Sequence, residues 1–113
     1  MKETPKSISE WSVQTFSDLT EYSQEKKLIE ELIEYIKAKT EDERVKELSD
    51  VYIVASILKE RFNNDLGFYA FREIYTPSMT AVYKAVDDKM EINRSRVWKF
   101  IDGVWHHTEK TDE

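Results

Sequence analysis

The stretch KLIEELIEYIKAKTEDERVKELSDVYIVASIL, residues 27–58, carries two acidic pairs on what its spacing predicts to be two successive helices. Glu31 and Glu34 form the first pair, and Glu47 and Asp50 form the second. Each helical residue advances by about 100°, so positions three apart lie about 60° apart around the axis. Each pair can therefore point its carboxylate oxygens at one place.

A tight turn near residues 39–40 would bring the two acidic pairs together. The segment Thr40-Glu41-Asp42-Glu43 has the spacing of a capping box, and its acidic side chains suit the positive end of a helix dipole. We therefore expect a helix that begins at this cap and folds back antiparallel on the helix before it.

Two interpretations of the acidic pairs follow from the residues alone. Four carboxylates held between two helices repel one another unless a cation neutralises them, and Mg²⁺ prefers oxygen ligands of this kind. The alternative is a pair of solvated acidic faces, because 35% of the residues are charged and acidic residues are seldom buried. The spacing alone favours the solvated faces and leaves the metal site open.

The rest of the chain predicts an all-α bundle of four to five helices in a single domain over residues 1–113. Two glycines and two prolines leave little material for tight turns. Ser7 and Ser23 are expected helix caps, Gly67 is an expected helix terminus, and Thr76 with Pro77 is expected to restart the chain as a helix. Residues 1–6 and 108–113 are expected to be flexible. The predicted helices cover residues 7 to about 18–22, about 24–39, 40 to a break at 63–67, 68–75, and 77 to about 91 or beyond.

Apolar spacing on the second and third predicted helices indicates what they bury. The second helix has an apolar arc of about 140° opposite its acidic group, which predicts that its carboxylates lie outside the main core contact. Residues 51–58, VYIVASIL, are apolar almost all round, so we expect burial on every side and a second subunit on the far side. A homodimer or homotetramer is the resulting expectation. The arc consists of Leu28, Ile29, Leu32, Ile33 and Ile36.

Charge and composition exclude several classes of protein. A net charge of −6 argues against a nucleic-acid or anionic-membrane partner, and the absence of cysteine excludes disulfides and thiolate chemistry. No apolar run reaches the roughly 18 residues of a membrane span. The chain is thus expected to be a soluble cytoplasmic protein.

Aromatic and basic residues outside this stretch have two interpretations each. Trp11 and Phe16 are ordinary candidates for the core. A basic stretch between Lys84 and Lys99 can contact phosphates or form a solvated face that pairs with the acidic one, and the residues alone favour the solvated face. Lys27, one turn before Glu31, can likewise contact a phosphate or form a plain ion pair with Glu31.

Three motifs resemble one known family. Glu30-Glu31-Leu32-Ile33-Glu34, a twelve-residue spacer and Glu47-Leu48-Ser49-Asp50 resemble the EExxE and ExxD signature of the MazG superfamily, the all-α nucleoside triphosphate pyrophosphohydrolases. WSVQTF at 11–16 and KMEINRSRVW at 89–98 are similar to segments of its small phage-type dATP/dGTP pyrophosphohydrolases. The spacer is short for the family, and Ser17 stands where related phage-type sequences tend to have glycine.

The resemblance implies a MazG-like fold and a metal-dependent reaction. The expected enzyme cleaves a nucleoside triphosphate, with dGTP or dATP favoured, between the α and β phosphates, using two or more Mg²⁺ or Mn²⁺ ions. Glu30 would orient the site or help to deprotonate the attacking water, and simple exposure is its equal alternative. The implied metal ligands are Glu31, Glu34, Glu47 and Asp50, which with Glu30 form the catalytic set. The implied substrate contacts are Trp11, Thr15, Phe16, Lys27, Lys89, Asn93 and Arg96.

Two other classes of function remain beside this one. A non-catalytic helical interaction or oligomerisation protein would use the apolar residues 51–58 as its interface and leave the acidic pairs in solvent. Nucleic-acid binding through the basic stretch is disfavoured by the net charge. His106 and His107 are a weak metal signal without a third ligand, and we expect them to be ordinary tail residues. If the chain is phage-encoded, as the resemblance suggests, it would act in the host cytoplasm.

Overall fold

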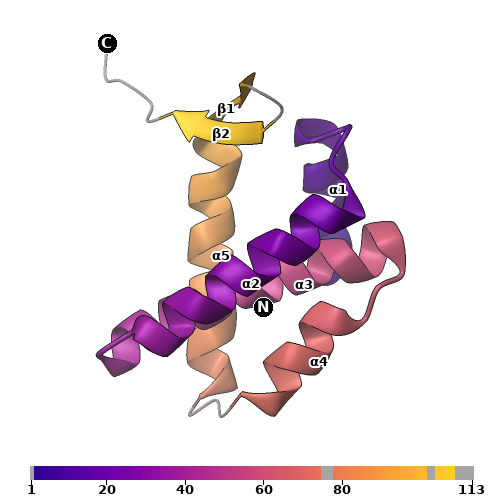
Figure 1. Ribbon diagram of the computed structural model, residues 1–113. Helices are drawn as coiled ribbons and strands as arrows, with labels where there is room; N and C mark the ends of the chain where they lie inside the picture. The colour runs from indigo at the N-terminus through magenta and orange to yellow at the C-terminus, as the bar shows by residue number, and fades with distance from the viewer. Residues whose placement is uncertain (1, 75–77, 102–103, 109–113) are drawn as a thin grey trace.

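The computed structural model of the protein describes residues 2–74, 78–101 and 104–108 (Figure 1). These ranges hold five helices and one antiparallel hairpin, so the predicted all-α bundle is confirmed except for the hairpin at its C-terminal end. No helix in the same ranges combines the length and the apolarity needed to cross a membrane. The elements are α1 (Pro5–Thr15), α2 (Glu21–Lys37), α3 (Glu41–Phe62), α4 (Leu66–Glu73), α5 (Met79–Ser95), β1 (Val97–Ile101) and β2 (Val104–Thr108).

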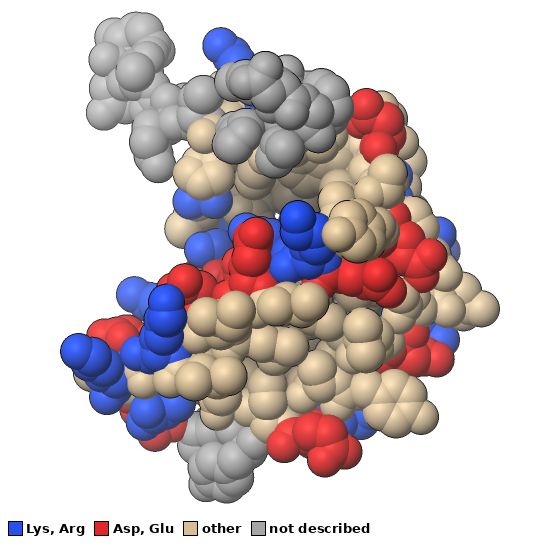
Figure 2. Space-filling view, viewed as in Figure 1, with Lys and Arg blue, Asp and Glu red and all other residues tan. Residues whose placement is uncertain are grey.

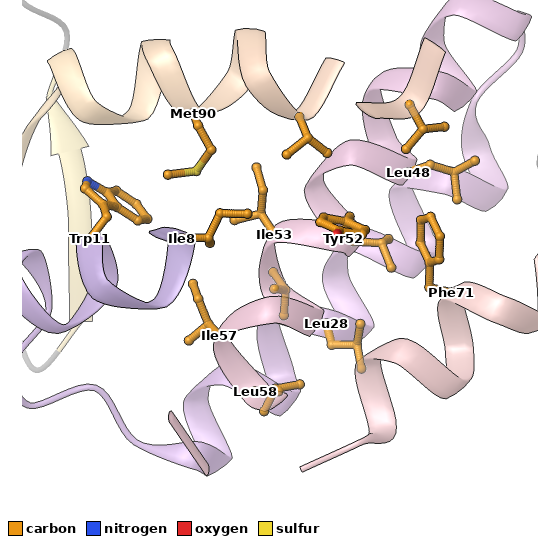
Figure 3. Close-up of a cluster of buried hydrophobic side chains, with 14 of the residues drawn as sticks. Ile8, Trp11, Leu28, Leu48, Tyr52, Ile53, Ile57, Leu58, Phe71 and Met90 are labelled. Atoms are coloured by element: carbon orange, nitrogen blue, oxygen red, sulfur yellow. The ribbon is translucent and has the colours of Figure 1, made fainter. Parts of the chain in front are cut away.

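The long helix α3 is the centre of the molecule, and α1, α2, α4 and α5 each pack against it. Every residue from Val51 to Leu58 is buried, as the apolar pattern predicted. Figure 3 shows side chains of all five helices converging on this segment, with Trp11 from α1, Leu28 from α2, Phe71 from α4 and Met90 from α5. Because the chain's own helices cover α3, this segment gives no reason to expect a second subunit.

Hydroxyl side chains cap four of the five helices. The Thr40 side chain accepts a hydrogen bond from the Glu43 amide at 3.1 Å, which confirms the predicted start of α3. The caps expected at Ser7 and Ser23 are wrong by three residues, because Thr4 caps α1 and Thr20 caps α2. Each of these serines instead donates its amide to the preceding threonine hydroxyl.

The start of α5 also differs from the expectation. The Ser78 side chain accepts from the Ala81 amide at 3.2 Å, so α5 begins at Met79. The predicted cap at Thr76 and the predicted first residue Pro77 lie outside the described residues.

The described part of the N-terminal arm, residues 2–6, is bound to α5 or belongs to α1, so it is not loose as we expected for residues 1–6. Met1 lies outside the described residues. The amides of Lys2 and Glu3 donate to the Asp87 carboxylate at 3.0 and 2.8 Å. The Glu3 carboxylate accepts two bonds from the Arg94 guanidinium, at 2.8 and 3.0 Å. Helix α1 then begins at Pro5, where proline's missing N–H costs nothing. Arg94, one of the cations of the basic stretch, is thereby engaged by the arm.

The C-terminal hairpin was not predicted. Strands β1 and β2 pair antiparallel, with Trp98 opposite His107. Their sequences, VWKFI and VWHHT, are rich in β-branched and aromatic residues and flank an Asp-Gly dipeptide, which is a strong hairpin signal. The expectation that His106 and His107 are ordinary tail residues is wrong, because both belong to β2. Of the tail expected at 108–113, Thr108 also belongs to β2, and residues 109–113 lie outside the described residues.

Gly67 lies inside α4 and does not terminate a helix. The residue that ends α3 in the left-handed region is Asn63, with a φ of 51°. A Cβ on Gly67 would stand 2.5 Å from the Cα and 2.7 Å from the Cβ of Ala55, closer than real side-chain contacts. Gly67 is therefore required by the close approach of α4 to α3.

We predict that Gly67→Ala destabilises the protein. In an exposed helix the same change is stabilising by about 1 kcal/mol, whereas the overlap with Ala55 should cost about 1–3 kcal/mol here. Urea unfolding measures the difference. The double variant Gly67→Ala, Ala55→Gly should not restore the stability, because the Ala55 Cα at 2.5 Å remains. A Gly67→Ala protein as stable as the wild type, or more so, would contradict this packing.

Candidate metal centre and cavity

Helices α2 and α3 bring three of the four predicted metal ligands together. One carboxylate oxygen each from Glu31, Glu47 and Asp50 lie within 4.8 Å of one another. Glu31 comes from α2, and the other two lie one turn apart on α3. The turn before Thr40 thus has the predicted effect, because it folds the two acidic helices side by side.

The face that α2 buries is not the one we predicted. Ile29, Ile33 and Ile36 are 56%, 44% and 76% exposed, whereas Glu31 is only 8% exposed. The buried stripe instead follows Gln24, Leu28 and Glu31, with Leu32 and Tyr35 half-buried beside it. The buried stripe has the same helical spacing as the expected arc, and Leu28 and Leu32 belong to both. Helix α2 is turned so that a carboxylate enters the core contact and isoleucines remain outside.

Burial and mutual repulsion change the acidity of the three carboxyl groups. Burial, followed by the charge of the neighbouring Asp50, raises the pKa of Glu31 to about 7, although Lys27 acts in the opposite direction. Burial also raises the pKa of Glu47 and of Asp50 above their ordinary values. The two carboxyl groups of Glu31 and Asp50 also interact directly, which contributes to the raised pKa of Glu31. The pair therefore holds one proton near neutral pH that solvated carboxylates would release.

Two lysines stand against this cluster. Lys89 of α5 places its Nζ 3.5 Å from Asp50 Oδ1. Lys27 places its Nζ 3.3 Å from Glu31 Oε1 and 3.8 Å from Glu30 Oε2, so the plain ion pair that we considered is present. Positive charge from the protein thus reaches the same oxygens that a bound cation would contact.

The other predicted residues near the cluster occupy different positions. Glu30 is exposed and lines the cavity described below. Glu34 is exposed, and its charge helps to raise the pKa of Glu47, but it is not part of the three-oxygen cluster. Thr15 is the last residue of α1 and does not line the cavity.

A cavity of about 910 Å³ opens beside the cluster and has two chemically different ends. Figure 2 shows a hollow in the surface with acidic and basic side chains gathered together along its edge. The charged end is lined by Lys27, Glu30, Glu31, Asp50 and Lys89. The aromatic end is lined by Trp11, Phe16, Trp98 and Trp105, together with Asn93, Arg96 and His107.

Phe16 is the centre of the aromatic end. Its ring centroid lies 5.3 Å from Trp11, 4.8 Å from Trp98 and 5.3 Å from Trp105, and each pair meets edge to face. The hairpin supplies Trp98 and Trp105, which we did not predict as site residues. The Trp105 Nε1 donates to Asp18 Oδ1 at 3.2 Å, so the hairpin is joined to the segment after α1. The hairpin signal in the sequence would have identified both tryptophans.

Asn93 and Arg96 link the aromatic end to α5. Asn93 is buried, and its Oδ1 accepts from Arg96 Nη1 at 3.3 Å. The Asn93 carbonyl accepts from Trp98 Nε1 at 3.2 Å, which holds the first strand of the hairpin against the end of the helix. The structure therefore brings six of the seven predicted substrate contacts to one cavity, with Thr15 as the exception.

The chain matches no protein-family model, no curated protein and no solved structure. The resemblance to the MazG superfamily accordingly rests on the three motifs in the sequence.

The three carboxylates have the donor set that suits a hard divalent cation. All three ligand atoms are oxygens, and two of the three groups have a pKa raised mainly by burial together with neighbouring carboxylates. A cation bound here would relieve this repulsion and displace the proton, so its binding would be linked to deprotonation of Glu31.

We predict that Glu31 makes the metal-free protein less stable as the pH rises. With a pKa of about 7 when folded and 4.5 when unfolded, Glu31 keeps its proton in the folded state over an interval where the unfolded chain has lost it. Stability should therefore fall between about pH 5 and pH 8, by on the order of 1–2 kcal/mol after allowance for solvent screening.

Unfolding in EDTA at several pH values measures this effect. Glu31→Gln should lose this part of the pH dependence and be the more stable protein at about pH 8. Glu60→Gln, which alters an exposed carboxylate elsewhere on α3, is the control and should keep the wild-type profile. Identical profiles for wild type and Glu31→Gln would contradict the elevated pKa.

Proposed function

We propose that the protein is a Mg²⁺- or Mn²⁺-dependent nucleoside triphosphate pyrophosphohydrolase that releases a nucleoside monophosphate and pyrophosphate. The observation that supports this best is the two-ended cavity. Its charged end has carboxylates for cations and lysines for phosphates, and its aromatic end has the flat apolar surfaces that suit a nucleobase. The three sequence motifs contribute residues to these same two ends.

Glu31, Glu47 and Asp50 would hold the divalent cation, and Glu34, whose charge helps to raise the pKa of Glu47, is the fourth carboxylate of the proposed set. A bound Mg²⁺ or Mn²⁺ would supply Lewis-acid stabilisation of the negative charge that develops on the phosphate oxygens. The carboxylates themselves would hold the cation in place and would lose their shared proton on binding it.

The lysines have a second role in this proposal. Lys27 and Lys89 now neutralise Glu31 and Asp50, at 3.3 and 3.5 Å. When a cation takes over that task, both ammonium groups become available to the β and γ phosphates, which they stabilise as leaving pyrophosphate. Arg96 lines the aromatic end of the same cavity and would add positive charge there for a bound nucleotide. Glu30, exposed at the edge of the cavity, is placed to accept a proton from the attacking water.

A second candidate function is favoured by a different observation, the exposed apolar side of α2. Tyr22, Ile29, Ile33 and Ile36 are each at least 44% exposed on this helix. A non-catalytic helical interaction protein would use such a face for its partner. For this chain we propose that the partner on the exposed side of α2 is a second copy of the protein, in a homodimer or homotetramer. A stable monomer in light scattering at micromolar concentration would contradict this.

The proposed activity is tested by incubating the protein with all common NTPs and dNTPs in Mg²⁺ or Mn²⁺. We expect monophosphate and pyrophosphate in equal amounts, with dGTP or dATP among the best substrates, and no products in EDTA. Release of orthophosphate alone, or no turnover of any nucleotide with either metal, would contradict the proposal.

Asp50→Asn is the matched test of the cluster. It removes one anionic ligand at nearly constant volume, so the fold should persist while turnover falls by about 10²-fold or more. Asp42→Asn makes the same change at an exposed position on the same helix and should keep wild-type turnover. A folded Asp50→Asn protein with most of the wild-type activity would remove the metal centre from the proposal.

A further inference from the structure

Arg61, near the end of α3, reaches back to the end of α1. Its Nη1 donates to the carbonyl oxygens of Ser12 and Phe16 at 3.1 and 2.9 Å, and to the Ser12 hydroxyl at 3.3 Å. Its Nη2 donates to the Ser17 carbonyl at 3.3 Å. One guanidinium therefore holds the last turn of α1 and the first two residues after it.

These bonds suit the chemistry of a helix end. The last carbonyls of a helix lack partners within the helix, and a cation there is favoured by the helix dipole. Burial lowers the pKa of Arg61, whereas the nearby Asp18 raises it, and the guanidinium remains charged in any case. The three bonded carbonyls are shared between Nη1 and Nη2, so the planar guanidinium reaches them from two separate nitrogens, whereas an ammonium would have to reach all three from one.

The segment that Arg61 holds carries two residues of the aromatic end. Phe16 is the ring that touches Trp11, Trp98 and Trp105. Asp18, two residues on, accepts the Trp105 indole N–H and so ties down the hairpin. The position of this segment therefore determines where the aromatic rings stand relative to the rest of the cavity.

We propose that Arg61 is a positioning residue for the nucleoside end of the substrate. It fixes residues 16–18, and through them the aromatic end of the cavity, without lining the cavity itself. This inference rests on the proposed function, because it gives the aromatic end the task of binding the base.

The charged end should be independent of Arg61. Arg61 lies eleven positions after Asp50 on α3, which is about 16 Å along a helix. None of the carboxylates or lysines of the cluster bonds to the segment that Arg61 holds. A ligand that contacts only the charged end should therefore bind the wild type and the Arg61 variant equally well, and it serves as the control.

The test compares Arg61→Lys with Arg72→Lys, the same change at an exposed arginine on α4. The best nucleotide of the substrate panel gives KM and kcat, and inorganic tripolyphosphate, which has no base, gives an inhibition constant. We expect Arg61→Lys to raise KM about fivefold or more while kcat and tripolyphosphate inhibition stay within about twofold. Arg72→Lys should match the wild type in all three.

Each other outcome counts against the inference. An unchanged KM shows that the cap of α1 does not position the base, and an equal loss of nucleotide and tripolyphosphate binding shows a general structural role. If Arg61→Lys does not fold, Trp105→Phe loosens the same segment from the hairpin side by removing the N–H that Asp18 accepts, and an unchanged KM there overturns the inference. A wild-type protein that hydrolyses no nucleotide defeats the proposed function and this inference together, whereas an active wild type with an unaltered variant defeats this inference alone.

Discussion

The burial of Glu31 between α2 and α3, next to Asp50 and Glu47, is the constraint on which the rest of this molecule depends. An unpaired buried carboxylate is costly, and two further carboxylates within 4.8 Å increase the cost. The protein offsets it with a proton near neutral pH and with Lys27 and Lys89. Turning α2 to bury its isoleucines would avoid this cost, so the buried acid is the feature on which the proposed metal site is based.

The two ends of the cavity are built in different ways. The charged end comes from long helices packed on the buried centre of α3, where Gly67 allows α4 to approach Ala55 closely. The aromatic end comes from the segment after α1 and from a hairpin that follows α5, joined by ring contacts and the bond between Trp105 and Asp18. Helices fix the groups whose geometry must be exact, and shorter connected pieces form the surface that would select a base.

Much of this arrangement could be predicted from the sequence, for identifiable reasons. The cap at Thr40 and the three-residue spacing of Glu47 and Asp50 are local signals, and both predicted the structure correctly. The rotation of α2 could not be predicted, because Leu28 and Leu32 belong equally well to the expected stripe and to the observed one with Glu31. Which stripe is buried depends on the partners that α3 and α5 provide, Lys89 among them. The hairpin could have been predicted from its Asp-Gly dipeptide. The role of Arg61 could not, since nothing in the local sequence shows that a side chain of α3 caps α1.

The most direct test of the metal centre is a crystal structure of the protein grown in Mn²⁺, with anomalous diffraction recorded at a wavelength where manganese scatters. The account predicts an anomalous peak between Glu31, Glu47 and Asp50, with carboxylate oxygens at about 2.2 Å, and Lys27 and Lys89 turned away from those oxygens. A well-ordered site without such a peak, with both lysines still bonded to Glu31 and Asp50 at saturating Mn²⁺, would contradict it.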